Sequence, residues 1–277
     1  MSNFNKGLEE STFIYGSFDF LRSGLGFALI GANISAEEKN EIARVIEKIG
    51  NYTTNNPNQV QWLSVKTNNN KHLILAFSFG GKDEHGRKTF ISKGFSLSEK
   101  EFSAFHFDPF FILPYIKVDY SSLKDEISTK NIKNNFVSPN YDLLNASKMI
   151  ENNLNDLKII ALSIWTNTKI QIPFESNQVS LLKTSLLLTP IKDRKIVNLT
   201  TCSSQISKSI SINLSEDIKT IISNLSGSNE KLDLRFNKAI EAVRLLDYEN
   251  YFDYIFSRKK KSPNKVIQFF NKLFKRK

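Results

Sequence analysis

An acid, an imidazole and a guanidinium stand within five residues of one another at Asp83, His85 and Arg87. Side chains of these types can transfer protons or hold an anion. The segment also has the chemistry of a turn, because Asp83 can accept backbone N–H bonds and Gly86 can adopt a positive φ. A turn explains every residue except His85. We therefore expect a structural turn, keep a hydrolase- or nuclease-like site as the alternative, and assign no catalytic residue.

The histidines and the cysteine give no pattern of metal ligands. His72, His85 and His106 lie too far apart in the sequence to show ligand spacing. Cys202 is the single cysteine, so the chain forms neither an internal disulfide nor a multi-cysteine zinc site. Its neighbours carry hydroxyls and no positive charge that would activate the thiol. The sequence predicts no metal site and a passive thiol in a reducing compartment.

Glycine-rich loops of the kind that hold phosphates are missing from the sequence. Gly81-Lys82 is followed by Asp83 instead of Ser or Thr, so the pattern of the phosphate-binding loop fails. Gly24-Leu25-Gly26 is followed by leucine at position 29, where the dinucleotide fingerprint needs a glycine. No cofactor is therefore predicted.

Positive charge is concentrated at the C-terminal end. The 277 residues include 38 basic and 28 acidic side chains, a net charge of +10. Residues 258–277 hold no acidic side chain and nine basic ones, namely Arg258, Lys259, Lys260, Lys261, Lys265, Lys272, Lys275, Arg276 and Lys277. The rest of the chain is therefore nearly neutral. A nucleic acid is the weaker expectation as a partner, because phosphate-binding charge would be needed on the body too.

The same C-terminal segment has the spacing of an amphipathic helix that begins near Pro263. One face is apolar and consists of Val266, Phe269, Phe270, Leu273 and Phe274. Three interpretations stay open. The helix can lie on an anionic membrane, dock into an apolar groove of a partner, or pack on the protein's own body.

The remaining chain contains the elements that must position these residues. Short apolar runs predict strands at 12–20, 25–30, 60–65, 72–79, 89–91, 158–165, 195–202 and 209–214. Helical spacing and capping residues predict helices at 35–49, 98–105, 142–157, 176–188, 215–225 and 230–256. The capping boxes are Ser35 with Glu38 and Ser98 with Glu101.

Strands and helices alternate irregularly, so the predicted class is α/β or α+β, with a mixed sheet, flanking helices and a C-terminal helical extension. We expect an N-terminal α/β subregion at 1–118 and a second at 141–225, within one module and joined by a polar connection at 119–140. Residues 229–277 would hold the C-terminal helices and the basic tail. The polar Met1–Glu10 segment and the lack of an 18-residue apolar run favour a cytoplasmic protein.

Three ordered segments carry a family resemblance. The first is Ile14-Tyr15-Gly16, and the second is Gly81-Lys82-Asp83-Glu84-His85-Gly86-Arg87 with Phe95-Ser96-Leu97 after it. The third runs from Leu186-Leu187-Leu188-Thr189-Pro190 through Arg194 to Asn198-Leu199-Thr200-Thr201. Together they resemble the N-terminal domain of GTPase-associated protein type one, a bacterial family, over roughly residues 12–225. The motif positions are Tyr15, Gly16, Gly81, Asp83, Gly86, Arg87, Pro190, Arg194 and Thr201.

The chain departs from this family at three places, one of which is Lys88-Thr89 in place of a glycine-containing step. Lys82 stands where the family usually has Arg, and Gly94 stands near a common His, so no role of that His is carried over. The resemblance implies a non-enzymatic adaptor or regulator in a prokaryotic defence system, with an NTPase or sensor as its protein partner. A peripheral membrane effector that acts through the basic tail is a further alternative.

Overall fold

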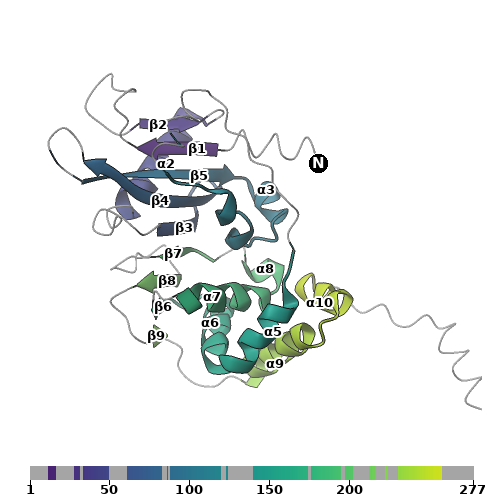
Figure 1. Cartoon of the computed structure of the whole chain (residues 1–277). Helices are drawn as coiled ribbons and strands as arrows, with labels where there is room; N and C mark the ends of the chain where they lie inside the picture. The colour runs from purple at the N-terminus through teal and green to yellow at the C-terminus, as the bar shows by residue number, and fades with distance from the viewer. Residues whose placement is uncertain are drawn as a thin grey trace, which may run out of the picture.

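The computed structural model describes residues 12–16, 28–31, 34–49, 61–82, 86, 88–119, 123, 140–173, 176–194, 197–201, 212–215, 222–223 and 230–257. Among these residues, nine strands form one sheet in the order β2-β1-β5-β4-β3-β7-β8-β6-β9 (Figure 1). The strands are β1 (Thr12–Gly16), β2 (Ala28–Gly31), β3 (Gln61–Lys66), β4 (His72–Lys82), β5 (Lys88–Leu97), β6 (Ile170–Pro173), β7 (Leu199–Thr201), β8 (Ile212–Ser215) and β9 (Ile222–Ser223). The predicted mixed α/β fold is confirmed.

The sheet runs through both predicted α/β subregions. Strands β1 to β5 pair antiparallel with one another, and β3 pairs antiparallel with β7 at Leu63↔Thr200 and Ser64↔Leu199. Beyond this seam β7 and β6 both run parallel to β8, and β9 closes the edge antiparallel to β6. The seam therefore joins segments that lie more than one hundred residues apart in the sequence.

Tight hairpins build the antiparallel half. Between β3 and β4, the Thr67 amide donates to the Lys71 carbonyl, and Asn70 takes a φ of 57°, a conformation that asparagine tolerates well. The β4–β5 hairpin shifts register between Phe79 and Lys82, where Gly81 has a φ of 90°. Gly86 in the following loop has a φ of 76°, as the expected turn requires.

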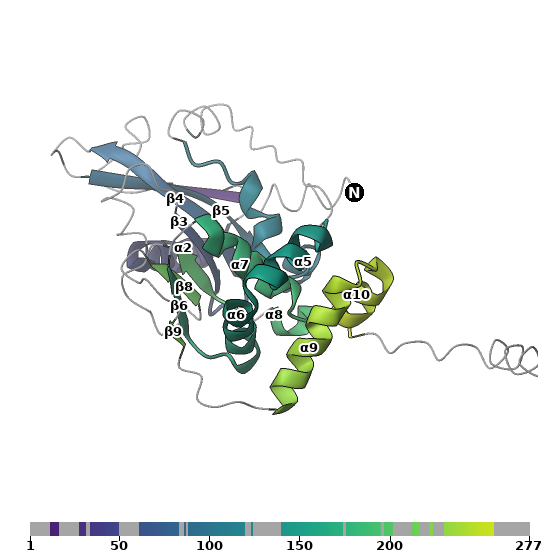
Figure 2. The same ribbon diagram turned by 60° about the horizontal axis from the view of Figure 1, so that its bottom comes forward.

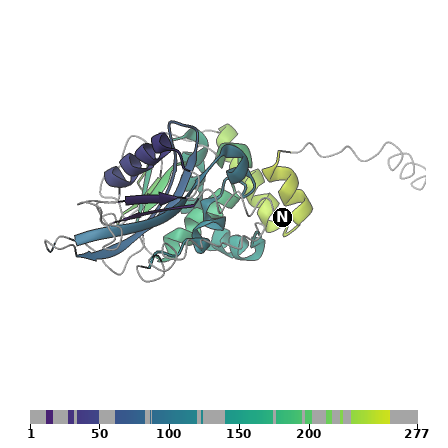
Figure 3. The ribbon, with the colours of Figure 1, turned by 90° about the horizontal axis from the view of Figure 1, so that it is seen from above.

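One face of the sheet is covered by helix α2 (Ala36–Ile49), as Figure 3 shows from above. The amide of Glu38 donates to Ser35 Oγ at 3.2 Å, which confirms the predicted helix start. Ile42 and Ile46 are fully buried and pack with Phe13, Leu75 and Phe77 of the strands.

The opposite face carries the remaining helices and the larger core (Figures 2 and 3). They are α3 (Glu99–Ser103), η3 (Pro109–Phe111), η4 (Leu113–Tyr115), α5 (Leu143–Asn152), α6 (Leu154–Thr166), α7 (Ser176–Leu187), α8 (Ile191–Arg194), α9 (Glu230–Arg244) and α10 (Tyr248–Ile255). The predicted capping box of Ser98 and Glu101 is present at α3. Within the described ranges, no helix is long and apolar enough to cross a membrane.

Two predicted elements are wrong in type. Residues 158–165 form part of helix α6 and not a strand, because a short apolar run does not distinguish a buried strand from a buried helix. Leu157, Ile160, Ala161 and Ile164 are all buried in the core. The predicted helix at 215–225 is wrong at both places that the structure describes, since Ser215 ends β8 and Ile222–Ser223 form β9.

Two predicted helices are each divided. The 142–157 helix breaks at Asn153, which lies between α5 and α6. The 230–256 helix breaks after Arg244, because Leu246 takes a φ of 51° and the Asp247 side chain accepts amide bonds at the start of α10. Leu246 is consequently exposed and not part of the buried face that its helical spacing predicts.

Gly94 provides a test of the sheet packing. A Cβ at this position would lie 2.4 Å from Leu75 Cβ and 2.6 Å from the Ile74 carbonyl oxygen, so backbone would have to move. We expect Gly94→Ala to lower the free energy of unfolding by about 1–3 kcal/mol in a chemical denaturation experiment.

The control is Ser92→Ala on the same strand and the same face. The Ser92 hydroxyl is buried and has no hydrogen-bond partner in the described part of the chain, so its removal should leave stability unchanged or raise it. Equal stability of the two variants would contradict the close β4–β5 approach.

Candidate functional site

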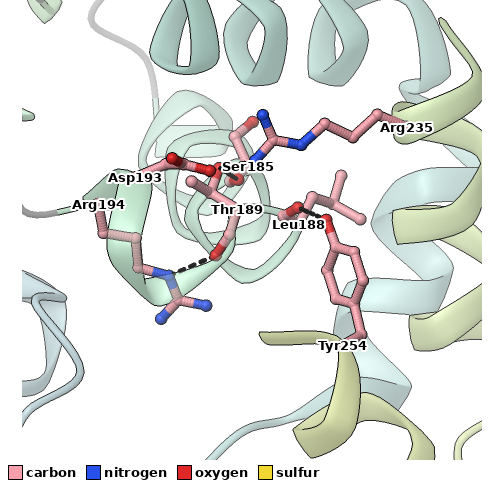
Figure 4. Close-up of polar contacts among 7 residues, drawn as sticks. All are labelled: Ser185, Leu188, Thr189, Asp193, Arg194, Arg235 and Tyr254. Carbon is pink, nitrogen blue, oxygen red and sulfur yellow. Dashed lines mark hydrogen bonds and ion pairs between the residues drawn. The ribbon is translucent and has the colours of Figure 1, made fainter. Parts of the chain in front are cut away.

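The C-terminal end of α7 is the centre of the helical layer. Helix α7 ends at Leu187, and Pro190 follows three residues later. Arg194 at the end of α8 then reaches back, and its Nε donates to the Thr189 carbonyl at 2.7 Å (Figure 4). The Arg194 residue is only 1% exposed. A cation at this position complements the partial negative charge of the helix end.

Further hydroxyls bind the last carbonyls of α7. The Tyr251 hydroxyl donates to the Leu187 carbonyl at 3.2 Å, and the Tyr254 hydroxyl donates to the Leu188 carbonyl at 2.6 Å (Figure 4 shows the second). Both tyrosines belong to α10. Groups that every helix leaves without an internal partner are therefore satisfied by a helix far along the chain.

An ion pair fixes α9 to the same place. Arg235 of α9 binds the Asp193 carboxylate of α8, and its guanidinium lies 4.4 Å from the centre of the Trp165 ring (Figure 4 shows the ion pair). Helices α8 and α10 thus contact the end of α7, and the ion pair ties α9 to α8.

The far side of the Arg194 guanidinium meets an aromatic pair. Arg194 Nη1 donates to the Tyr141 hydroxyl at 3.0 Å, and that hydroxyl lies 2.6 Å from His106 Nδ1. Burial and the Arg194 charge lower the pKa of His106 to about 4, so the ring is neutral at pH 7. Because the Tyr141 oxygen accepts from Arg194, its proton is available for His106 Nδ1. Arg194 Nη2 is buried without a hydrogen-bond partner among the residues described.

Asp108 is the buried acid of this region. It is 3% exposed, and its Oδ1 accepts from the Phe110 amide at 2.9 Å, which starts η3. Burial raises the pKa of Asp108 to about 6, although the Arg194 charge acts in the opposite direction. Its second oxygen, Oδ2, has no hydrogen-bond partner in the described ranges.

Asp108 lines a cavity of about 270 Å³ between η3, α5 and α7. Lys183 also lines it and holds its ammonium 5.9 Å from the centre of the Phe110 ring. The other lining residues are Phe110, Phe111, Asn140, Tyr141, Asp142, Asn145, Ala146, Ser180, Thr184 and Leu187. This cavity combines a buried carboxylate, a cation, small polar groups and aromatic walls, which is the composition of a small-molecule site.

The described residues of the family motifs lie in four separate places. Tyr15 and Gly16 lie on β1, where the Tyr15 hydroxyl donates to Glu47 Oε1 at 3.1 Å, and Gly81 and Gly86 belong to the β4–β5 hairpin. Thr201 lies on β7, where its Oγ1 accepts from the Trp62 amide at 2.7 Å.

Pro190 and Arg194 are the two motif positions that lie in the helical layer. Asp83, His85, Arg87, Cys202 and the tail residues 258–277 lie outside the described residues.

Sequence reasoning missed Asp108 and Tyr141 as site residues. Asp108 lies beyond the helix predicted at 98–105, and in the structure it begins η3 as a cap. Tyr141 was placed at the edge of a polar connection. The sequence contained one signal of a buried charge, namely Arg194, which follows Pro190 at the end of an apolar helix and needs hydrogen-bond partners if it is buried.

Gly94 also explains one departure from the resembled family. A side chain at position 94 has no room against Leu75, so a histidine does not fit there in this fold. Among the described residues, no group of three or more His, Cys, Asp or Glu could hold a metal ion.

Comparison with known proteins found no relative. No family model matches the chain, and neither the curated proteins nor the solved structures contain a significant match. The resemblance to the GTPase-associated family stays a prediction.

Arg194→Met tests the central contact. The variant leaves the Thr189 carbonyl and the Tyr141 hydroxyl without their donor, so we expect a loss of about 3 kcal/mol in the free energy of unfolding. Chemical denaturation measures it. Lys192→Met on the same short helix is exposed and should change stability by no more than about 0.5 kcal/mol. Similar losses in both variants would contradict the central role of Arg194.

Asp108→Asn has a pH-dependent effect. Asp108 stays protonated up to about pH 6 in the folded state, whereas the same carboxyl ionises near pH 3.8 in the unfolded chain. Because of this difference, Asp108 lowers the free energy of unfolding as pH rises from 3.8 to about 6. His106 acts oppositely, since its lowered pKa costs stability as pH falls from 6.5 towards 4. The difference between variant and wild type isolates Asp108.

Between pH 4 and pH 7, we expect the free energy of unfolding of Asp108→Asn to rise by about 3 kcal/mol relative to that of wild type, because a shift of two pKa units corresponds to that free energy. Urea denaturation at several pH values measures the difference. A difference that does not change with pH would show that the Asp108 carboxyl is not desolvated.

Proposed function

We propose that this chain is a non-enzymatic adaptor that binds a partner protein through its helical layer. The observation that carries the proposal is a set of exposed apolar side chains on α9, α10 and the turns after them. Leu234 and Leu245 are each 58% exposed, and Leu246, Tyr248 and Phe256 are also exposed. Leu245 also lines a groove, and exposed apolar side chains at a groove are typical of a binding site.

A groove lies between these two helices. It has a volume of about 480 Å³ and is lined by Lys238, Glu241, Ala242, Leu245, Asn250, Asp253 and Tyr254. We call it the α9–α10 groove. Leu245 and Ala242 give it an apolar part, and charged residues form its rim. A partner side chain can be anchored there and surrounded by polar contacts, as in other protein interfaces.

The charge of the chain favours a partner with an acidic surface. Residues 258–277 follow directly after α10 and its turn, and they carry nine basic and no acidic side chains. An apolar anchor in the α9–α10 groove and acidic residues facing this segment would combine burial with electrostatic attraction.

The family resemblance suggests which partner this is. It implies an NTPase or sensor of a prokaryotic defence system, encoded beside this chain, and a cytoplasmic location. An anionic membrane as a second contact of the basic segment belongs to the same proposal. The α9–α10 groove gives the NTPase or sensor a docking place that the sequence pattern alone did not indicate.

The test uses the full chain and each protein encoded next to its gene, with affinity measured by biolayer interferometry. We expect Leu245→Asp to weaken binding by at least about tenfold, because a carboxylate would be buried against an apolar anchor. Leu154→Asp is the control, since Leu154 is exposed at the start of α6 and away from the groove.

Two results would contradict the proposal. One is that no neighbouring gene product binds the chain. The other is that Leu245→Asp binds as tightly as wild type and the Leu154→Asp control.

A further inference from the structure

We propose that the cavity between η3, α5 and α7 binds a small zwitterion of the amino-acid type. Its ammonium group would contact Asp108, and its carboxylate would contact Lys183. This inference goes beyond the adaptor function and does not depend on it, because the cavity is lined by different residues from the α9–α10 groove.

Asp108 supplies the argument for a positively charged group. Asp108 is only 3% exposed, and it lines the cavity. One carboxylate oxygen is used by the Phe110 amide, and the other has no hydrogen-bond partner among the described residues. That second oxygen is not one of the fully buried atoms left without a partner, so it is open to the cavity and a donor there can reach it. An ammonium group supplies both the donors and the opposite charge.

Arg194 does not fill this role. Its charge acts on Asp108, but its hydrogen bonds go to the Thr189 carbonyl and the Tyr141 hydroxyl. With a pKa of about 6, Asp108 is mostly ionised at neutral pH, and the nearby guanidinium favours this because it opposes the effect of burial on the pKa. The unused oxygen therefore remains available to a ligand.

Lys183 supplies the argument for a negatively charged group. Its side chain lines the same cavity as Asp108, comes from α7, and is exposed. Because both side chains line this one cavity, one small molecule can contact both groups. Opposite charges on one cavity match a molecule that carries an amine and a carboxylate at a short separation.

The walls and the volume limit the size of the ligand. Phe110, Phe111 and Leu187 are apolar, whereas Ser180 and Thr184 bring hydroxyls from α7. A cavity of about 270 Å³ lies just below the range of about 300–1,000 Å³ for drug-sized ligands. Free amino acids fit these limits, and their side chains can contact the aromatic walls.

Isothermal titration of the full chain with each standard α-amino acid tests the proposal. We expect at least one of them to bind. Its N-acetyl analogue lacks the ammonium, and its amide analogue lacks the carboxylate, so both should bind more weakly. Loss of the contact to the buried Asp108 should cost more than about tenfold in affinity.

Variants separate the two charges. Asp108→Asn should weaken binding more than about tenfold, whereas Lys183→Met, at an exposed position, should weaken it by up to about fivefold. Lys192→Met is the matched control and should bind like wild type. Circular dichroism checks that each variant is folded. For wild type, affinity should fall as pH drops below about 6, because Asp108 becomes protonated.

Three results would overturn the proposal. The first is that no amino acid binds at millimolar concentration. The second is that the acetylated and amidated analogues bind as tightly as the free amino acid, which would indicate a neutral polar ligand. The third is that folded Asp108→Asn keeps wild-type affinity, which would place the ligand elsewhere on the chain.

Discussion

The contact between the Arg194 guanidinium and the end of α7 holds the helical layer together. A helix end inside a protein leaves carbonyl groups that must find donors, and a buried cation must find acceptors. Arg194 Nε binds the Thr189 carbonyl, and the Tyr251 and Tyr254 hydroxyls bind the Leu187 and Leu188 carbonyls. The position of α10 against α7 follows from this exchange.

The same guanidinium connects the helix end to a separate group of polar residues. Through the Tyr141 hydroxyl it reaches neutral His106, and its charge acts on Asp108 beside the cavity. A structural contact and a candidate ligand site therefore share one buried charge. Because His106 and Asp108 titrate in opposite directions over a similar pH range, their effects on stability partly cancel in the wild-type protein.

Local patterns predicted much of the fold but little of the site. Capping residues located the starts of α2 and α3. Residues 158–165 were misassigned because a helix buried on most sides has no polar face to show its period. Arg194 entered only through a family resemblance. Asp108 and Tyr141 gain their importance from contacts between segments distant in sequence, which no local pattern contains.

The seam between β3 and β7 has a consequence for the order in which the chain folds. All pairings among β1 to β5 lie within the first 97 residues, including the longer-range pairing of β1 with β5, so these strands can form while the ribosome is still making the rest. The seam must wait for residues 199–201, and the end of α7 must wait for Tyr251 and Tyr254. A nascent chain that stops before α10 would therefore present an unfinished helical layer on a completed antiparallel platform.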